Sequence, residues 1–230
     1  MKLYVGVSGG IDSMYLLSHL IEYRDIYNIT CLCFNHGSDE FSKEACILVK
    51  DYCSLHNIKF IQGSMTTEFD KGNLEKLWRV GRYQFFKEHV GTNTLLLAHH
   101  KTDQYVSWLM SRLKNSSRCF IPVINEYEGM SIIRPLYLKS KSHIKEYIMQ
   151  NNIPTLEDPY NTKGDRGRTE LELIPLVDSV FPHTKGVFRK LYNAYLKKNH
   201  LPLYIPSRNI PLNKLIDLLI SKCNQGVTTC

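Results

Sequence analysis

Residues 2–13 read KLYVGVSGGIDS, and this stretch decides which fold we expect. Residues 3–7 form an apolar run of the kind found in strands that are buried on both faces. The two glycines that follow allow a tight turn, and residues 12–24 then repeat apolar side chains at helical spacing. A strand, a glycine turn and a helix in this order predict the first unit of a parallel α/β sheet.

The same alternation continues along the chain. We expect further strands at residues 29–35, 58–61, 94–98 and, briefly, 132–133, and helices at residues 42–56, 74–89, 104–113 and 143–150. This order predicts an α/β fold with a Rossmann-like, mostly parallel sheet that carries helices on both faces. Ligands of such sheets bind at the carboxyl ends of the strands, so we expect the site after Val7, Phe34 and Ala98.

The length and composition describe a globular chain with one full-sized domain and an appendage. It has 230 residues, of which 43% are hydrophobic and 22% charged. Residues 3–7 are too short an apolar run for a signal peptide, and no stretch reaches the ~20 apolar residues that cross a bilayer. The seven cysteines are scattered and odd in number, which favours reduced thiols. We therefore expect a cytoplasmic protein without a membrane partner.

The net charge of +7 lies in the C-terminal tail. Residues 185–230 contain eight Lys and Arg side chains against one acidic side chain, so the first 184 residues are neutral overall. We expect a catalytic domain at residues 1–184 and a basic helical tail at residues 185–230, with amphipathic helices at residues 185–198 and 210–222. Such a tail either binds phosphates of a nucleic acid or is an ordinary solvated basic face.

The turn after the first strand has the residues of an anion site. Gly9 and Gly10 let the backbone approach a ligand, while Ser8, Ser13 and free N–H groups at the helix start can bind phosphate. The Gly-Lys-Ser/Thr ending of a Walker A loop is missing. Asp12 fits either a magnesium-bridged pyrophosphate or a helix cap.

The segment from Ser8 to Ser13 resembles the pyrophosphate loop of the N-type ATP pyrophosphatases, also called the PP-loop superfamily, which cleave ATP between the α- and β-phosphates. Further segments resemble the tRNA(Ile)-lysidine synthetase family of that superfamily, and together they cover residues 1–176 in order. They are Asn35-His36-Gly37, Gly72-Asn73-Leu74-Glu75 with Arg79, Arg82-Tyr83-Gln84-Phe85-Phe86, Ala98-His99-His100-Lys101-Thr102-Asp103-Gln104, Ile133-Arg134-Pro135-Leu136 and Glu157-Asp158-Pro159-Tyr160-Asn161.

The resemblance implies an AMP-forming ligase. It uses ATP and Mg²⁺, adenylates the carbon-2 oxygen of the wobble cytidine in an isoleucine tRNA, and attaches lysine there. By the same resemblance Asp103 is a catalytic aspartate and Arg82 faces the phosphates. Asp12 is then the magnesium or pyrophosphate residue, and Glu75 is a candidate partner of the lysine ammonium.

Each of these residues also has a structural interpretation. Asp103 fits the N-cap of the helix at residues 104–113, Arg82 fits a solvated helix face, and Glu75 fits an exposed carboxylate. His99 is assigned to ATP binding, and no Cys or Glu stands at ligand spacing beside His99 and His100, so we expect no metal site in the protein itself.

The loop before Pro175 and the tail are the predicted tRNA contacts. The residues assigned to tRNA are Arg166, Arg168, Lys185, Arg189, Lys190, Lys197 and Lys198. The family pattern is altered at four positions, namely Asn35, Thr102, Gly167 and Glu170. These departures leave two alternatives open: another PP-loop adenylating enzyme with a different nucleophile or acceptor, and a non-catalytic relative that binds nucleotide or tRNA.

Overall fold

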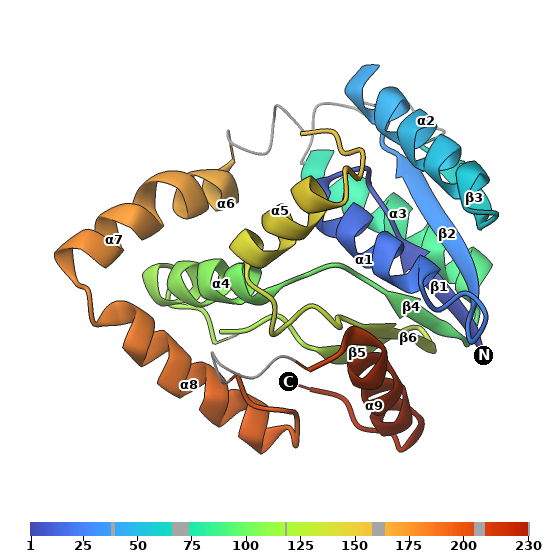
Figure 1. The fold of residues 1–230 in the computed structure, drawn as a ribbon. Helices are drawn as coiled ribbons and strands as arrows, with labels where there is room; N and C mark the ends of the chain where they lie inside the picture. The colour runs from blue at the N-terminus through green and yellow to red at the C-terminus, as the bar shows by residue number, and fades with distance from the viewer. Residues whose placement is uncertain (38–39, 66–73, 118, 158–163, 205–209, 230) are drawn as a thin grey trace.

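A six-stranded sheet forms the centre of the structure, a computed structural model (Figure 1). The structure describes residues 1–230 except residues 38–39, 66–73, 118, 158–163, 205–209 and 230, and except the side chains of residues 74–75. The strands are β1 (Lys2–Gly6), β2 (Asn28–Asn35), β3 (Lys59–Ser64), β4 (Thr94–Leu96), β5 (Ile124–Tyr127) and β6 (Met130–Ile133). Their order across the sheet is β3-β2-β1-β4-β6-β5.

Five of the strands are parallel, as the alternation of strands and helices predicts. β1 pairs with β2 and β4, β2 also pairs with β3, and β4 also pairs with β6. The exception is β5, which pairs antiparallel with β6 through a turn at Glu128 and Gly129, both at positive φ. The expected α/β fold is therefore confirmed, and β5 is an addition that the sequence did not predict.

The helices alternate with the strands and continue past the sheet. They are α1 (Ile11–Ile21), α2 (Glu40–Leu55), α3 (Leu74–Val90), α4 (Lys101–Leu113), α5 (Lys141–Gln150), α6 (Asp165–Arg168), the π-helical η1 (Thr169–Leu173), α7 (Ile174–Val180), α8 (Thr184–Lys198) and α9 (Leu212–Asn224). The run from α6 to α7 was not predicted. In addition, α4 begins three residues and α5 two residues before the expected starts.

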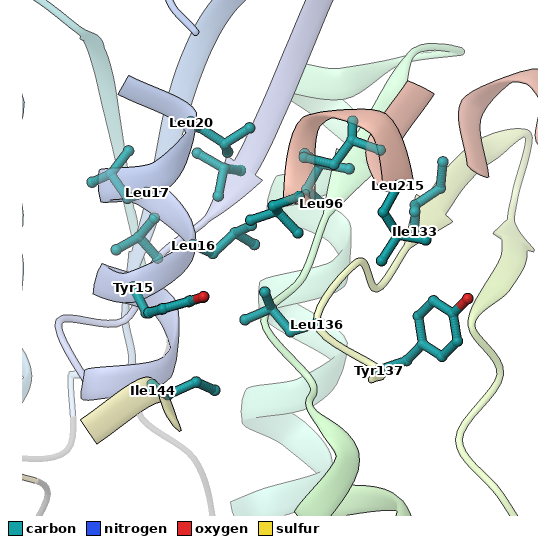
Figure 2. Close-up of a cluster of buried hydrophobic side chains, with 14 of the residues drawn as sticks. Tyr15, Leu16, Leu17, Leu20, Leu96, Ile133, Leu136, Tyr137, Ile144 and Leu215 are labelled. Atoms are coloured by element: carbon teal, nitrogen blue, oxygen red, sulfur yellow. The ribbon is translucent and has the colours of Figure 1, made fainter. Parts of the chain in front are cut away.

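Two apolar clusters pack on opposite faces of the sheet. One contains Tyr4 and Leu95 of the strands together with Phe86 of α3. The other contains Leu3 and side chains of α1, α2 and α9. Figure 2 shows the second cluster, in which Leu16 of α1 points toward Leu96 of β4 and Leu215 of α9 lies beside Ile133. Helices thus cover both faces, as expected.

The tail forms the two helices that the sequence predicts, and both join the main core. In α8, Phe188, Tyr192 and Leu196 are buried in the same cluster as the sheet, and the Tyr192 hydroxyl donates to the Tyr137 carbonyl at 3.0 Å. The predicted apolar face of this helix is only partly covered, because Val187 is 50% exposed. Within the described residues, no helix is long and apolar enough to span a membrane.

Candidate active site

The turn between β1 and α1 is shaped by the Ser13 hydroxyl. This hydroxyl accepts a hydrogen bond from the Ser8 N–H at 3.1 Å and donates one to the Gly10 carbonyl at 2.9 Å. Ser13 is buried, whereas Ser8 is exposed at the turn. Ser8 therefore lies in the turn, and Ser13 in the first turn of α1 fixes the backbone shape of the loop through these two hydrogen bonds.

The backbone at Gly9 requires glycine for two reasons. Its φ is +79°, a left-handed conformation that side chains disfavour. A Cβ atom there would also lie 3.1 Å from the Ala45 Cβ and 3.2 Å from the Ala45 carbonyl oxygen of α2. The Gly9 carbonyl accepts the N–H of Leu156 at 3.0 Å, so the turn is held from two sides.

Asp12 is not a helix cap, which excludes one of its two sequence interpretations. The N-cap of α1 is Gly10, and no side chain caps this helix. The Asp12 carboxylate instead contacts two residues outside α1. Its Oδ2 accepts a hydrogen bond from the Lys141 ammonium at 2.6 Å, and its Oδ1 lies 3.3 Å from His100 Nε2.

These contacts bring three helix N-termini together. Asp12 is in the first turn of α1, His100 is the N-cap of α4, and Lys141 is the first residue of α5. The Lys141 N–H also donates to Thr102 Oγ1 of α4 at 3.3 Å. Because each N-terminus carries a partial positive charge, their meeting point is a strong site for an anion.

His100 connects the two aspartates of this centre. Its Nδ1 accepts hydrogen bonds from the N–H groups of Thr102 and Asp103, at 3.1 and 3.4 Å. The Nδ1 atom is therefore unprotonated, and the ring proton sits on Nε2, which lies 3.3 Å from Asp12 Oδ1 and 3.6 Å from Asp103 Oδ2. The His100 side chain is 2% exposed, so it contacts both carboxylates from inside the protein.

Asp103 lies in the first turn of α4 with both carboxylate oxygens engaged. Its Oδ2 accepts the His100 N–H at 2.7 Å, and its Oδ1 pairs with the Arg166 guanidinium. The N-cap interpretation of Asp103 is therefore wrong, because the cap is His100 and Asp103 completes the capping box from the third helical position. Burial alone would raise the pKa of Asp103, but the electrostatic influence of the His100 ring and the charge of Arg166 lower it below its usual value.

Burial also raises the pKa of Asp12, and here too other effects dominate. The nearby Nε2–H of His100, together with the charge of Lys141, brings the pKa of Asp12 below its usual value. Asp12 and Asp103 are thus carboxylates at neutral pH, and neither is set up as a proton donor.

A group of cationic and neutral nitrogens lies beside the aspartates. Burial lowers the pKa of His99 to about 3, helped by the charges of Arg134, Arg166 and Arg82, so the ring is neutral. Its Nδ1 is buried and has no hydrogen-bond partner among the residues that the structure describes. Arg134 is buried and donates to the Pro122 carbonyl at 2.7 Å, which gives it a role in supporting this edge.

Arg82 of α3 is the unpaired member of this group. It is half-buried, and no described residue forms an ion pair or a hydrogen bond with its guanidinium. Burial lowers the pKa of Arg82. A desolvated cation without a partner is costly, and it is the arrangement that an anionic ligand would complete. The solvated-face interpretation of Arg82 is not what the structure shows.

The predicted tRNA residues fall into two groups. Arg166 reaches the centre through Asp103, whereas Arg168 pairs with Glu172 and Lys185 pairs with Asp178 at 3.0 Å. The other four are exposed on α8, and no described residue forms an ion pair with them: Arg189, Lys190, Lys197 and Lys198. Glu75 lies in the first turn of α3, but its side chain is outside the described part of the structure, as are Asp158 to Asn161.

Lys141 is the site residue that the sequence analysis missed. It follows β6, whose end was not among the three strand ends considered. The signal was present, because Ser140 is a typical N-cap and stands seven residues after the strand, at the same sheet edge. Thr102, which the sequence analysis treats only as a departure from the family pattern, is also part of the site. Its hydroxyl oxygen accepts the Lys141 N–H and so connects α4 to α5.

The site fits a magnesium-bound triphosphate. Asp12 Oδ1 is buried and faces His100 Nε2 at 3.3 Å, and no described residue donates a well-aligned hydrogen bond to it. Such an oxygen is a natural ligand of a hard cation. The N-termini of α1, α4 and α5 meet at this carboxylate, and the charge of Arg82 acts on the neighbouring His99. Helix N-termini and a guanidinium both suit phosphate oxygens. The arrangement can therefore bind a polyphosphate and stabilise negative charge that develops on it.

Comparison with known proteins agrees with this geometry. The PP-loop domain family matches residues 1–176. The tRNA(Ile)-lysidine synthase of Staphylococcus aureus (strain COL) is 32% identical over an alignment of 190 residues that covers 76% of this chain and 44% of that protein. The synthase of Malacoplasma penetrans (strain HF-2) is 28% identical over 238 residues, covering 98% of this chain and 74% of that protein.

Among solved structures, the U34-tRNA thiolase NcsA from Methanococcus maripaludis with its [4Fe-4S] cluster has the same fold, with a TM-score of 0.67 at 15% identity over 92% of this chain and 80% of that one. The chain spans less than half the length of the Staphylococcus relative. The match over residues 1–176 and the glycine turn at their start show that the chain belongs to the PP-loop domain family.

Proposed function

We propose that this protein is an ATP-dependent tRNA-modifying ligase of the lysidine-forming type. The single observation that carries the proposal is the meeting of the α1, α4 and α5 N-termini around Asp12, which His100 connects to Asp103. Arg82, which pairs with no described residue, supplies a further positive charge. This cluster supplies what adenylation needs: a phosphate cradle, a cation ligand and a positive charge for the reacting phosphate. The similarity to tRNA(Ile)-lysidine synthases supports the choice of substrates.

In the proposed reaction the carbon-2 oxygen of a cytidine attacks the α-phosphate of ATP, and pyrophosphate leaves. The ε-amine of lysine then attacks carbon 2 and displaces AMP. Bound Mg²⁺ would neutralise phosphate charge, and Asp12 would hold it through Oδ1.

The residues of this chain have separate tasks in that scheme. The turn from Ser8 to Ser13 binds the pyrophosphate part through its N–H groups, and Arg82 binds the phosphate that is attacked. Neutral His99 faces the nucleotide, and Asp103, kept ionised by His100 and Arg166, directs or deprotonates the attacking amine. Glu75 binds the lysine ammonium, and the basic face of α8 binds the tRNA backbone.

Nucleoside mass spectrometry tests the assignment. The protein is incubated with unmodified tRNA, lysine and ATP, and the digested tRNA is searched for lysidine. We expect lysidine from the wild-type protein and none from Asp103→Asn. AMP release without lysidine, on another acceptor, would refute the choice of lysine and favour a different nucleophile.

A further inference from the structure

Lys141 makes the shortest polar contact that Asp12 has in the structure. Its ammonium lies 2.6 Å from Asp12 Oδ2, and the side chains are 26% and 29% exposed. Partly exposed pairs of this kind add little to stability. Because Asp12 is the proposed magnesium ligand and this ion pair is partly exposed to solvent, the Lys141 contact is better explained by ligand binding than by a contribution to folding.

The helix that carries Lys141 is fixed firmly to the site. α5 packs on α1 through the rings of Tyr15, His19 and Tyr147, with centroids 4.3 to 5.1 Å apart. Beyond its C-terminus, the Leu156 N–H binds the Gly9 carbonyl at 3.0 Å. Both ends of the α5 segment thus contact the pyrophosphate loop, so the backbone of Lys141 is held while its long side chain stays adjustable.

The Asp12 carboxylate has two chemically different sides. Oδ2 holds the ammonium, whereas Oδ1 is buried, faces His100 Nε2 at 3.3 Å and receives no well-aligned hydrogen bond from a described residue. A divalent cation drawn to Asp12 competes electrostatically with the ammonium, since both are cations beside one carboxylate. Phosphate groups that arrive with that cation offer the ammonium a new set of oxygens close by.

We propose that Lys141 is a pyrophosphate-positioning residue, whose ammonium holds Asp12 in the nucleotide-free protein and contacts the β- and γ-phosphates once Asp12 ligates Mg²⁺. The inference rests on the proposed function, since it takes the turn from Ser8 to Ser13 to be the polyphosphate site. It adds the N-terminus of α5 to those of α1 and α4 as part of the phosphate site. The Lys141 ammonium then has two successive partners, which are Asp12 before nucleotide binds and the phosphates afterwards.

Binding measurements on the full chain test it. Calorimetry with Mg²⁺ and either inorganic pyrophosphate or α,β-methylene ATP should show at least tenfold weaker binding to Lys141→Met, because the ammonium–phosphate contact is lost. AMP, which has no β- or γ-phosphate, should bind within twofold of wild type. Lys141→Arg should keep most of the affinity. Lys145→Met is the matched control, since it removes an exposed cation from the same helix, and it should change nothing beyond twofold.

A second readout has the opposite sign. Mn²⁺ binding to the nucleotide-free protein, followed by electron paramagnetic resonance, should tighten at least threefold in Lys141→Met, because the ammonium no longer competes for Asp12. A purely structural role would weaken every ligand alike. If Lys141→Met does not fold, Lys141→Gln takes its place in both experiments.

Each result separates the inference from the proposed function. Wild-type protein that binds α,β-methylene ATP, with Lys141→Met binding it equally well, overturns the inference alone. Equal losses for AMP and pyrophosphate, or unchanged Mn²⁺ affinity, also overturn it. Wild-type protein that binds neither pyrophosphate nor α,β-methylene ATP overturns both. Tight, Lys141-dependent binding without tRNA-dependent turnover supports the inference and refutes the proposed reaction.

Discussion

Arg82→Met is predicted to slow ATP cleavage and at the same time to stabilise the folded protein. The guanidinium is half-buried on α3, no described residue pairs with it, and burial lowers its pKa. Methionine fills much of the same volume without a charge. Removing a desolvated, unpaired charge should therefore raise the free energy of unfolding of the ligand-free protein by about 1–2 kcal/mol.

The two effects have magnitudes that standard assays resolve. For a chain of this length, about 1–2 kcal/mol raises Tm by roughly 2–8 °C. Loss of a positive charge that stabilises the reacting phosphate should lower the rate of AMP formation by about 10²–10³-fold. Thermal unfolding without nucleotide gives the first number, and AMP release from α-phosphate-labelled ATP with tRNA gives the second.

Lys87→Met is the control on the same helix. Lys87 donates to the Glu128 carbonyl, so its loss should lower the free energy of unfolding by about 0.5–1.5 kcal/mol and leave AMP formation unchanged. The reasoning about Arg82 is refuted if Arg82→Met keeps wild-type turnover, or if it destabilises the ligand-free protein as Lys87→Met does.

Three further predictions follow from other parts of the structure. Gly9→Ala should lower the free energy of unfolding by about 1–2 kcal/mol from the positive φ alone, as urea unfolding would show, and should weaken α,β-methylene ATP binding in calorimetry. Wild-type stability and affinity in this variant would show that glycine is not required there. Neutralising Arg189, Lys190, Lys197 and Lys198 together should weaken tRNA binding and flatten its salt dependence while sparing ATP binding; unchanged tRNA affinity in filter binding would make α8 a solvated face. The pKa of His99 is about 3 in the folded protein and near 6.5 in the unfolded chain, so the free energy of unfolding should fall as the pH drops from ~6.5 towards 4. In urea unfolding at a series of pH values, His99→Gln should lose less stability over this range than wild type. The same pH dependence in both proteins would show that His99 is not desolvated.

Most of the sheet could be predicted because its strands are apolar runs bounded by turns. Buried parallel strands such as residues 29–35 contain few polar side chains, and that composition is visible without any tertiary information. β5 was missed since it has only four residues, two of them Asn125 and Glu126, and its pairing with β6 depends on the turn at Glu128 and Gly129. The helices between Asp165 and Val180 were missed because Gly167 and Pro175 interrupt the helical pattern.

The sequence was sufficient to predict the glycine turn and Asp103 as parts of the site. It was not sufficient to predict the contacts that join the residues of the site to one another. The pyrophosphate loop is a local feature, so Ser8 to Ser13 carry the signal by themselves. The ion pair of Asp12 with Lys141 joins residues 129 positions apart, and it forms only when α5 packs on α1. The capping of α4 by a histidine ring is equally hidden, because histidine is an uncommon N-cap and Asp103 fits that position by type.

ATP labelled at the α-phosphate tests the central claim most directly. The protein is incubated with this ATP and Mg²⁺, with and without total tRNA and lysine, and labelled AMP is separated by thin-layer chromatography. We predict AMP release that requires tRNA, increases with lysine, and disappears in Asp103→Asn. AMP formation that ignores tRNA, or its complete absence from a protein that binds ATP, would contradict the account.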